Sequence, residues 1–203
     1  MKIVQAPNPV LSQVAKTTGK VDSSIYNLIE EMKKTLSQTK DPEGVGLAAP
    51  QVGKSLRLFI AKPNPKSKVQ IFINPEIVSN NDGVKLTGDE LAGLPAEALA
   101  KVGPQTTSAT EAPEESKKLE GCLSLPTIWG EVKREKNVTV KFIDEKGQIQ
   151  TKTFSGLLAT IVQHETDHLN GILFPKRVLE QKGKLYKSKK DKNGEDIFQE
   201  LDL

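Results

Sequence analysis

The two histidines of the chain, His164 and His168, stand four positions apart with Glu165 directly after the first. Residues four apart on an α-helix share one face and are separated by a rise of about 6 Å, which a single tetrahedral metal ion can bridge. This is the His-Glu-x-x-His arrangement, in which two imidazoles hold a divalent metal and the glutamate manages the proton of a bound water. The pattern predicts a metal-dependent hydrolase.

A third metal ligand has to come from elsewhere in the chain. One large group of metalloproteases carries a third histidine after this motif, but here Gly171 is followed by Phe174 at that position, which excludes the group. The only cysteine, Cys122, is the remaining soft ligand, and a Cys/His/His set leaves one position for water. A lone cysteine is often an inert buried residue, and the downstream carboxylate of Glu180 stays an alternative ligand.

Two further segments strengthen the interpretation of residues 164–168 as a metal-binding motif. Residues 44–51 read Gly-Val-Gly-Leu-Ala-Ala-Pro-Gln, and residues 120–126 read Glu-Gly-Cys-Leu-Ser-Leu-Pro. Together with residues 164–168 they resemble, in order, the three signature segments of the peptide deformylase family: G-x-G-L-A-A-x-Q, E-G-C-x-S and H-E-x-D-H. The likeness extends from residues 3–7 to residues 173–175.

The family resemblance implies an activity and a set of site residues. The activity is removal of the formyl group from formyl-methionyl nascent polypeptides, with release of formate. The implied metal ligands are Cys122, His164 and His168; the implied catalytic groups are Glu165, the Gln51 side chain and the Leu123 backbone N–H. The alternatives are a metallo-amidase or peptidase acting on other N-blocked peptides, and a catalytically silent ribosome-associated protein.

The glycine-rich residues 44–51 have competing interpretations. A dinucleotide-binding fingerprint is excluded because the segment follows a helix and loop and no acidic residue stands at the expected distance. We instead expect a loop whose glycines let an extended peptide approach the backbone closely. The family resemblance implies that the peptide pairs there as an added strand with Val45 and Gly46. By resemblance, Ile161 is a candidate to line the methionine pocket, and Asp167 is expected to pair with Arg134. Trp129 is expected either at the rim of the site against the peptide or in ordinary packing.

The types of the ligand residues do not determine which metal is bound. Thiolate and imidazole ligands suit zinc, iron, cobalt and nickel, and the order of affinities alone does not select among them. The family resemblance implies Fe(II), which would make Cys122 sensitive to oxidation.

Length and composition predict one catalytic domain over residues 1–175 and a charged C-terminal tail over residues 176–203. A single cysteine cannot form an intrachain disulfide, and residues 1–7 lack an apolar export signal, so we expect a cytoplasmic protein. No apolar run approaches the roughly 20 residues that span a bilayer. The oligomeric state we expect is a monomer.

Periodicity predicts an α+β fold, with short mixed or antiparallel strands packed around a central metal-bearing helix that carries the His-Glu-x-x-His motif. Helices are expected over residues 23–40, capped by Asp22 or Ser23, and over residues 157–169. Buried strands are expected over residues 56–61 and 69–73, and a hairpin over residues 138–143 and 148–154.

Two charged or polar segments lack the apolar periodicity of the expected helices and strands. Residues 79–118 contain no aromatic residue and no isoleucine, which predicts a largely disordered insertion, with a brief helix near residues 95–102. The insertion is interpreted as a solvated loop or as a lid or partner-binding segment. In residues 176–192 eight basic side chains outnumber two acidic ones, which predicts a solvated tail. The family resemblance implies contact with ribosomal RNA as the alternative.

Overall fold

A computed structural model describes residues 1–40, 43–79 and 119–202 of the chain. The insertion expected over residues 79–118, with its brief helix, lies outside the described residues except for Ser79. The helices are α1 (Ser23–Gln38), α4 (Gly156–Leu169) and α5 (Phe174–Glu180), with 3-10 turns η1 (Pro9–Ser12) and η2 (Ala49–Val52). The strands are β1 (Gly46–Ala48), β2 (Leu58–Ala61), β3 (Gln70–Ser79), β4 (Leu119–Cys122), β5 (Leu125–Glu131), β6 (Asn137–Ile143), β7 (Ile149–Ser155), β8 (Leu185–Lys190) and β9 (Asp196–Glu200).

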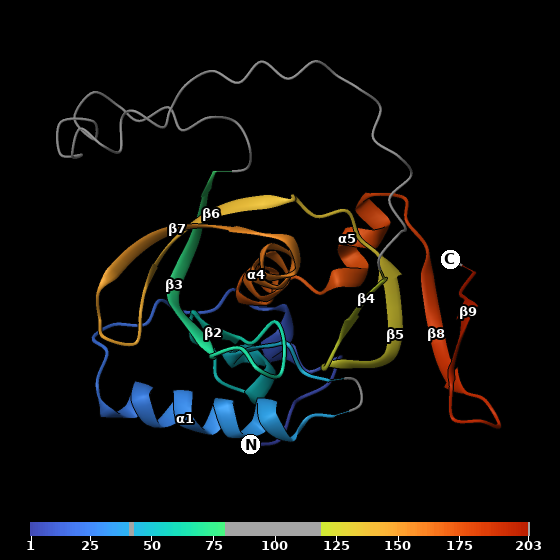
Figure 1. Ribbon diagram of the computed structural model, residues 1–203, viewed down its shortest axis with the longest axis horizontal. Coiled ribbons are helices and arrows are strands. Elements are labelled where there is room, and N and C mark those ends of the chain that lie inside the picture. Colours follow the sequence, from blue (N-terminus) through green and yellow to red (C-terminus); the bar gives the residue numbers. More distant parts are fainter. Residues whose placement is uncertain (41–42, 80–118, 203) are drawn as a thin grey trace, which may run out of the picture. The chain divides into compact units, whose positions relative to one another are not determined.

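The described strands form two sheets (Figure 1). One has the order β1-β2-β3-β6-β7 and the other the order β4-β5-β8-β9. Every strand pair within these two sheets is antiparallel. The expected mixture of helices and antiparallel strands is therefore confirmed.

Helix α1 begins as its sequence predicts. The Asp22 carboxylate accepts hydrogen bonds from the backbone N–H groups of Ser24 and Ile25, which would otherwise have no partner at the start of the helix. One face of α1 is apolar and packs on strands β1 to β3; its buried members are Ile25, Ile29, Met32 and Leu36.

Strands β2 and β3 are apolar on both faces because helices cover both sides of them. Leu58 and Ile60 point into the core shared with α1, whereas Phe59 joins the core shared with α4. In this second core Phe72 stacks on Phe59 with ring centroids 4.5 Å apart and also contacts Phe142 and Phe154. The continuous apolar run over residues 58–61 therefore reflects burial on two sides.

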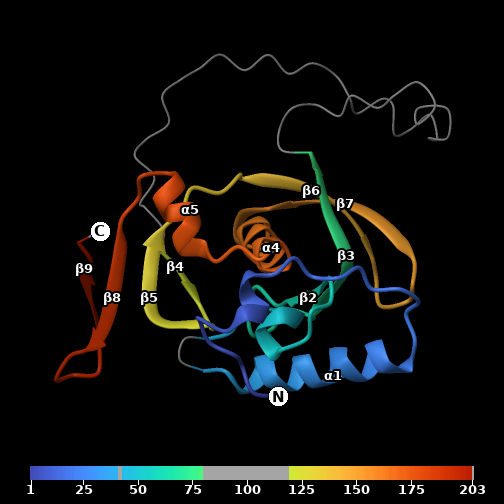
Figure 2. The same ribbon diagram turned by 180° about the vertical axis from the view of Figure 1, so that it is seen from behind.

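Helix α4 lies between the two sheets, as both ribbon views show (Figures 1 and 2). Its apolar residues Ala159, Ile161 and Val162 pack on the five-stranded sheet. The helix ends at Leu169, with Asn170 as its C-cap and Gly171 at a φ of 69°. The sequence predicted this helix to within one residue.

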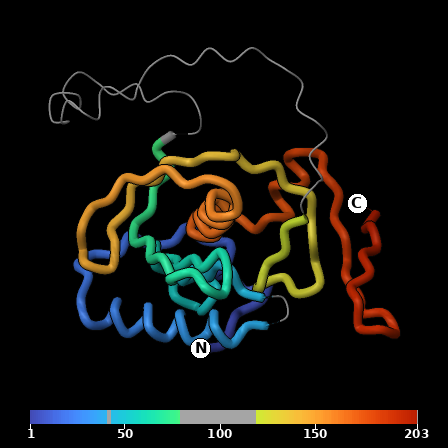
Figure 3. Tube along the Cα trace, viewed as in Figure 1, coloured from blue at the N-terminus to red at the C-terminus, as the bar shows by residue number. Residues whose placement is uncertain are grey.

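The C-terminal charged segment is folded over most of its length (Figure 3). Residues 176–180 continue α5, and β8 pairs antiparallel with β5 and with β9. The apolar side of α5 contributes Phe174 and Val178 to a third core with Cys122 and Leu185. The segment therefore extends the sheet that carries the cysteine.

Among the described residues, no helix is both long and apolar enough to cross a bilayer.

Candidate metal centre

Two elements far apart in the sequence bring the candidate ligands together. Helix α4 carries His164 and His168, and β4 ends at Cys122. One ligand atom from each of these residues lies within 4.8 Å of the others, and Cys122 Sγ is 3.2 Å from His168 Nε2. The sulfur and the two rings can therefore face a single ion, as the sequence predicted.

The charges in this cluster favour the ligand form of the cysteine. Burial raises the pKa of the Cys122 thiol, but the adjacent imidazoles outweigh burial and hold the pKa well below its usual value. Burial likewise lowers the pKa of His164, yet its contacts with Cys122 and Glu120 leave that pKa well above the usual value. Positive charge beside the sulfur stabilises the thiolate, and a divalent metal ion bound there can supply that charge in place of an imidazole proton.

Glu120 orients the first imidazole. Its Oε2 lies 3.1 Å from His164 Nδ1, so the opposite ring nitrogen, Nε2, is left to face the ion. Burial would raise the pKa of Glu120, but hydrogen bonds to His164 and Arg134 lower it to about 2. An ionised carboxylate on Nδ1 fixes the ring orientation and raises the basicity of the ligand nitrogen.

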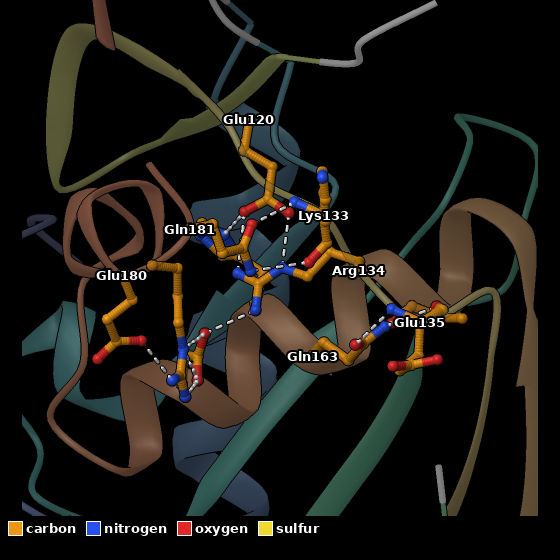
Figure 4. A network of polar contacts seen from close by, with 11 residues as sticks. Glu120, Lys133, Arg134, Glu135, Gln163, Glu180 and Gln181 are labelled. Atoms are coloured by element: carbon orange, nitrogen blue, oxygen red, sulfur yellow. Dashed lines mark hydrogen bonds and ion pairs between the residues drawn. The ribbon is translucent and has the colours of Figure 1, made fainter. Parts of the chain in front are cut away.

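Glu120 belongs to a network of ion pairs that joins β4, α4, α5 and the loop between β5 and β6 (Figure 4). Arg134 donates to Glu120 through Nε at 2.7 Å and Nη2 at 3.0 Å, and to Asp167 through Nη1 at 2.7 Å. Arg177 of α5 donates to Asp167 through Nη2 at 2.7 Å and to Glu180 through Nη1 at 2.9 Å. The expected pairing of Asp167 with Arg134 is confirmed.

The alternative third ligand, Glu180, has a different position. It is not part of the Cys122, His164 and His168 group, which is the one such group among the residues with described coordinates. Its carboxylate is 45% exposed and pairs with Arg177 instead.

Glu165 lies beside the ligands with an oxygen directed to no protein donor. The side chain is 4% exposed, and Oε2 has no hydrogen-bond partner among the described residues. Burial raises the pKa of Glu165 to about 7. A carboxyl group with this pKa can exchange a proton near neutral pH, which is the property required of a general base.

Gly46 of β1 leaves the space that Glu165 occupies. A Cβ atom at this position would overlap Glu165 Oε1 and would lie 2.9 Å from Ile161 Cγ2. The glycine is therefore needed for the close approach of β1 to the catalytic face of α4.

Gln51 is held at the cluster by two contacts. Its Oε1 accepts a hydrogen bond from the Ala48 backbone N–H at 2.8 Å, and its Nε2 lies 3.5 Å from Cys122 Sγ. The side chain is 1% exposed. Gln51 is therefore a buried residue of the centre.

The remaining sequence candidates surround the centre. Leu123 follows Cys122 directly, and the next amide, that of Ser124, donates to Cys122 Sγ at 3.4 Å. Ile161 lies on α4 one turn before His164 and is buried near Gly46. Val45 packs against the core beneath α4, and Trp129 lies on β5 opposite Gly121.

Two features of the centre were not predicted from the sequence. The roles of Glu120 on His164 and of Arg177 on Asp167 depend on contacts between distant segments. Glu120 stands within a signature segment, directly before Gly121 and Cys122, so its position offered a signal. Arg177 lies in a charge run, where its partner has no local sequence signal.

The donor set fits one divalent ion. A thiolate and two imidazoles are ligands for zinc, iron, cobalt or nickel, and three protein ligands leave one position for water or substrate. The unpartnered Oε2 of Glu165 supplies an acceptor for the proton of that water. This arrangement suits metal-assisted hydrolysis of an amide.

Comparison with known proteins identifies relatives over most of the chain. The family model for polypeptide deformylase matches residues 1–184. A peptide deformylase of Mesorhizobium japonicum is 36% identical over 175 residues, which is 85% of this chain and 80% of that protein. A peptide deformylase of Christiangramia forsetii is 35% identical over 204 residues, covering 93% of this chain and 87% of that protein.

Solved structures show the same relationship. The crystal structure of peptide deformylase from Thermotoga maritima has a TM-score of 0.64 and 32% sequence identity, covering 87% of this chain and 95% of that one. A peptide deformylase structure from Legionella pneumophila has a TM-score of 0.65 and 35% identity, covering 87% of this chain and 84% of that one.

Proposed function

Because the chain belongs to the peptide deformylase family, we propose that it hydrolyses the formyl amide of formyl-methionyl nascent polypeptides and releases formate. The observation that carries this proposal is the convergence of Cys122, His164 and His168 beside the unpartnered oxygen of Glu165. Its place in the cell is then in protein biosynthesis, at the processing of the N-terminal methionine.

The residues divide into those that hold the ion and those that move protons. Cys122, His164 and His168 would hold one divalent ion, with Glu120 fixing the His164 ring. Such an ion supplies Lewis-acid polarisation of the formyl oxygen and lowers the pKa of a bound water.

Glu165 is the proton carrier in this proposal. Its Oε2 takes a proton from the water whose oxygen forms a bond to the formyl carbon. The same carboxyl then gives that proton to the amide nitrogen as the C–N bond breaks. A pKa of about 7 suits both steps. The products are formate and a free amino group on methionine.

Gln51 and Leu123 stabilise the developing oxyanion. The Gln51 amide is fixed through Ala48 N–H, so its Nε2 is oriented before the substrate arrives. The Leu123 backbone N–H follows Cys122 directly and supplies a second donor. Donors fixed in this way act most strongly when negative charge develops on the oxygen.

The peptide substrate has two strand edges available. Among the described strands, β1 and β4 end the two sheets, and both reach the centre, through Gly46 and Cys122. An extended peptide can add to such an edge through backbone hydrogen bonds. We assign the backbone of Val45 and Gly46 to this pairing, and Ile161 to the wall of the methionine pocket.

The resident metal is proposed to be Fe(II), with zinc, nickel and cobalt as alternatives that the same ligands accept. The buried thiolate beside two imidazoles supports a soft or borderline ion. Elemental analysis of anaerobically purified protein tests this assignment: iron at one atom per chain is expected, and zinc at that ratio would replace it.

Substrate comparison tests the proposed activity. Formyl-Met-Ala should release formate, whereas acetyl-Met-Ala and an internal peptide bond should be cleaved far more slowly. The matched variant is Glu165→Gln, which keeps the size of the side chain and removes its proton acceptor. We expect a loss of roughly 100-fold or more, the usual contribution of a general base. Equal cleavage of acetyl-Met-Ala would favour the alternative metallo-amidase.

The wider context of the enzyme follows from the same chemistry. The Cys122 thiolate must stay reduced, which supports a cytoplasmic location. The catalytic unit, expected over residues 1–175, is proposed to continue through α5 and β8, because Val178 and Leu185 share a core with Cys122. Truncation after residue 175 should therefore abolish formate release, and full activity of that truncated chain would restore the shorter boundary. We also propose that the chain acts as a monomer, which light scattering tests.

Contact with ribosomal RNA is a separate proposal for the basic C-terminal segment. Lys187 and Lys189 are exposed on β8, where a phosphate backbone can reach them. Because β8 pairs with β5, charge reversal at these two lysines is a cleaner test than deletion of the strand. Weaker ribosome binding with a shallower salt dependence is expected; unchanged binding would remove the proposal.

A further inference from the structure

We propose that the C-terminal hairpin β8–β9 completes an aromatic platform, formed by Trp129 and Phe198, which binds an apolar side chain of the formylated peptide beyond its methionine. The inference rests on the proposed function, because it needs the peptide that pairs with Val45 and Gly46 to lie along the open edge of β4 as well. It assigns a substrate-binding role to the hairpin and a chemical preference to the downstream part of the substrate.

Trp129 lies across β4 towards the edge of the sheet. It stands opposite Gly121 in the antiparallel register of β4 and β5. A Cβ atom on Gly121 would lie 2.8 to 3.1 Å from three atoms of the six-membered part of the indole ring. The ring therefore covers the glycine and occupies the place of a side chain there. The aromatic surface of Trp129 therefore extends from β5 over β4.

The opposite side of the indole is held by the hairpin. Trp129 Nε1 donates to Ser188 Oγ of β8 at 3.1 Å. Phe198 of β9 pairs with Ser188 in register, and its ring meets the Trp129 ring edge-to-face with centroids 5.6 Å apart. Gly121 of β4 and Ser188 of β8 are small, which leaves room over the sheet for the rings of Trp129 and Phe198.

The platform is on the side of the sheet away from α5. Gly130 and Leu185, which alternate with Trp129 and Tyr186, pack against Val178 of α5, so their neighbours point to the other face. Phe198 is 41% exposed there although it is a large apolar residue. Trp129 is half-buried, so the pair offers one exposed ring, that of Phe198, and part of the indole. Such a surface is suited to an apolar ligand.

The platform borders the strand that carries Cys122, although the cysteine itself packs with α5 on the other face of the sheet. Gly121 directly precedes Cys122, and β4 is the end strand of its sheet among the described strands. A peptide added to this edge places alternate side chains on opposite faces. Those on the Gly121 face would meet the edge of the Trp129 ring. An apolar side chain at such a position gains a contact that a small or charged one does not.

A leucine scan of the substrate tests the proposal. Formate release is measured for formyl-Met-Ala and for longer formylated peptides with one leucine moved along otherwise serine and alanine positions. The wild-type enzyme should prefer leucine at one downstream position by roughly threefold to tenfold in kcat/KM, the usual strength of one aromatic contact. Phe198→Ala and Trp129→Ala should reduce this ratio.

Ile197→Ala is the matched control, because Ile197 is a neighbouring exposed apolar residue of β9 on the opposite face. It should leave the leucine ratio unchanged. Absence of any leucine preference, or a preference that survives Phe198→Ala, would overturn the platform while leaving the deformylase activity intact. Failure of every formylated peptide to release formate would overturn the proposed function as well.

Fluorescence gives a second test that does not depend on turnover. Trp129 is the only tryptophan in the chain, so emission reports on the platform alone. In the Glu165→Gln variant, the leucine peptide should shift the emission and formyl-Met-Ala should shift it less. If Phe198→Ala destabilises the hairpin, the emission shifts caused by the two peptides can be compared in the Phe198→Leu variant instead. Identical emission with both peptides, or a concentration-dependent shift without peptide from self-association, would contradict the proposal.

Discussion

Arg134→Met tests whether the ion-pair network supports the metal centre. The substitution keeps an unbranched apolar stem and removes three charged hydrogen bonds, two to Glu120 and one to Asp167. All three side chains are 9% exposed. Asp167 keeps Arg177 as a partner, but Glu120 is left buried with His164 alone. The main cost is therefore the uncompensated carboxylate of Glu120.

The magnitude follows from the burial of the pair. Removing one partner of a buried ion pair costs about 3–5 kcal/mol, and the surviving Arg177 contact places this variant near the lower end, at about 3 kcal/mol. For a chain of this size such a change lowers Tm by roughly 6–12 °C. Metal affinity should fall about 10-fold to 100-fold, because Glu120 no longer holds the His164 ring firmly.

Urea unfolding of the metal-depleted protein measures the first effect, and metal titration of the refolded protein measures the second. Arg177→Met is the matched control. Arg177 is 32% exposed and Asp167 keeps Arg134, so we expect at most about 1 kcal/mol and unchanged metal affinity. Equal metal affinity in the Arg134→Met variant and the wild type would refute the reasoning.

Three further predictions use the same geometry. Gly46→Ala should lower kcat by roughly 100-fold with unchanged metal content, because the added Cβ displaces Glu165 by about 1 Å; formate assays with elemental analysis measure both quantities, and retained kcat would contradict this. Chelation should lower Tm by about 5–10 °C if the ion is present at 100 times its Kd, since binding then stabilises by about 2.7 kcal/mol; calorimetry with and without added metal decides, and an unchanged Tm counts against a tightly held ion. Phe72→Ala should destabilise by about 3–5 kcal/mol because the ring is fully buried among three others, with Phe72→Leu less affected; equal urea midpoints for the two variants would show that ring packing is not the cause.

The metal ligands were predictable because the chemistry is written locally on one helix. The spacing of His164 and His168 determines that they share a face of α4, and only one cysteine was available to join them. Strands β2 and β6 and helix α1 were also predictable, since each has a strong apolar period or run. These elements carry their own signal within about ten residues.

The four-stranded sheet was not predicted because its signals are not local. Residues 185–190 read as part of a charge run, yet Leu185 and Ser188 are buried through pairing with β5. Helix α5 has only seven residues, so periodicity gives a weak signal for it. Its place depends on the core that it shares with Cys122 and Leu185. Contacts of this kind depend on partners more than forty residues away.

X-ray absorption spectroscopy of the metal-loaded protein tests the central claim most directly. If Cys122, His164 and His168 hold the ion, the first shell should contain one sulfur at about 2.3 Å and two nitrogens at about 2.0–2.1 Å from a zinc-loaded sample. The sulfur signal should disappear in the Cys122→Asp variant. A first shell made of nitrogen and oxygen alone in the unmodified protein would contradict the proposed centre and the hydrolytic chemistry that depends on it.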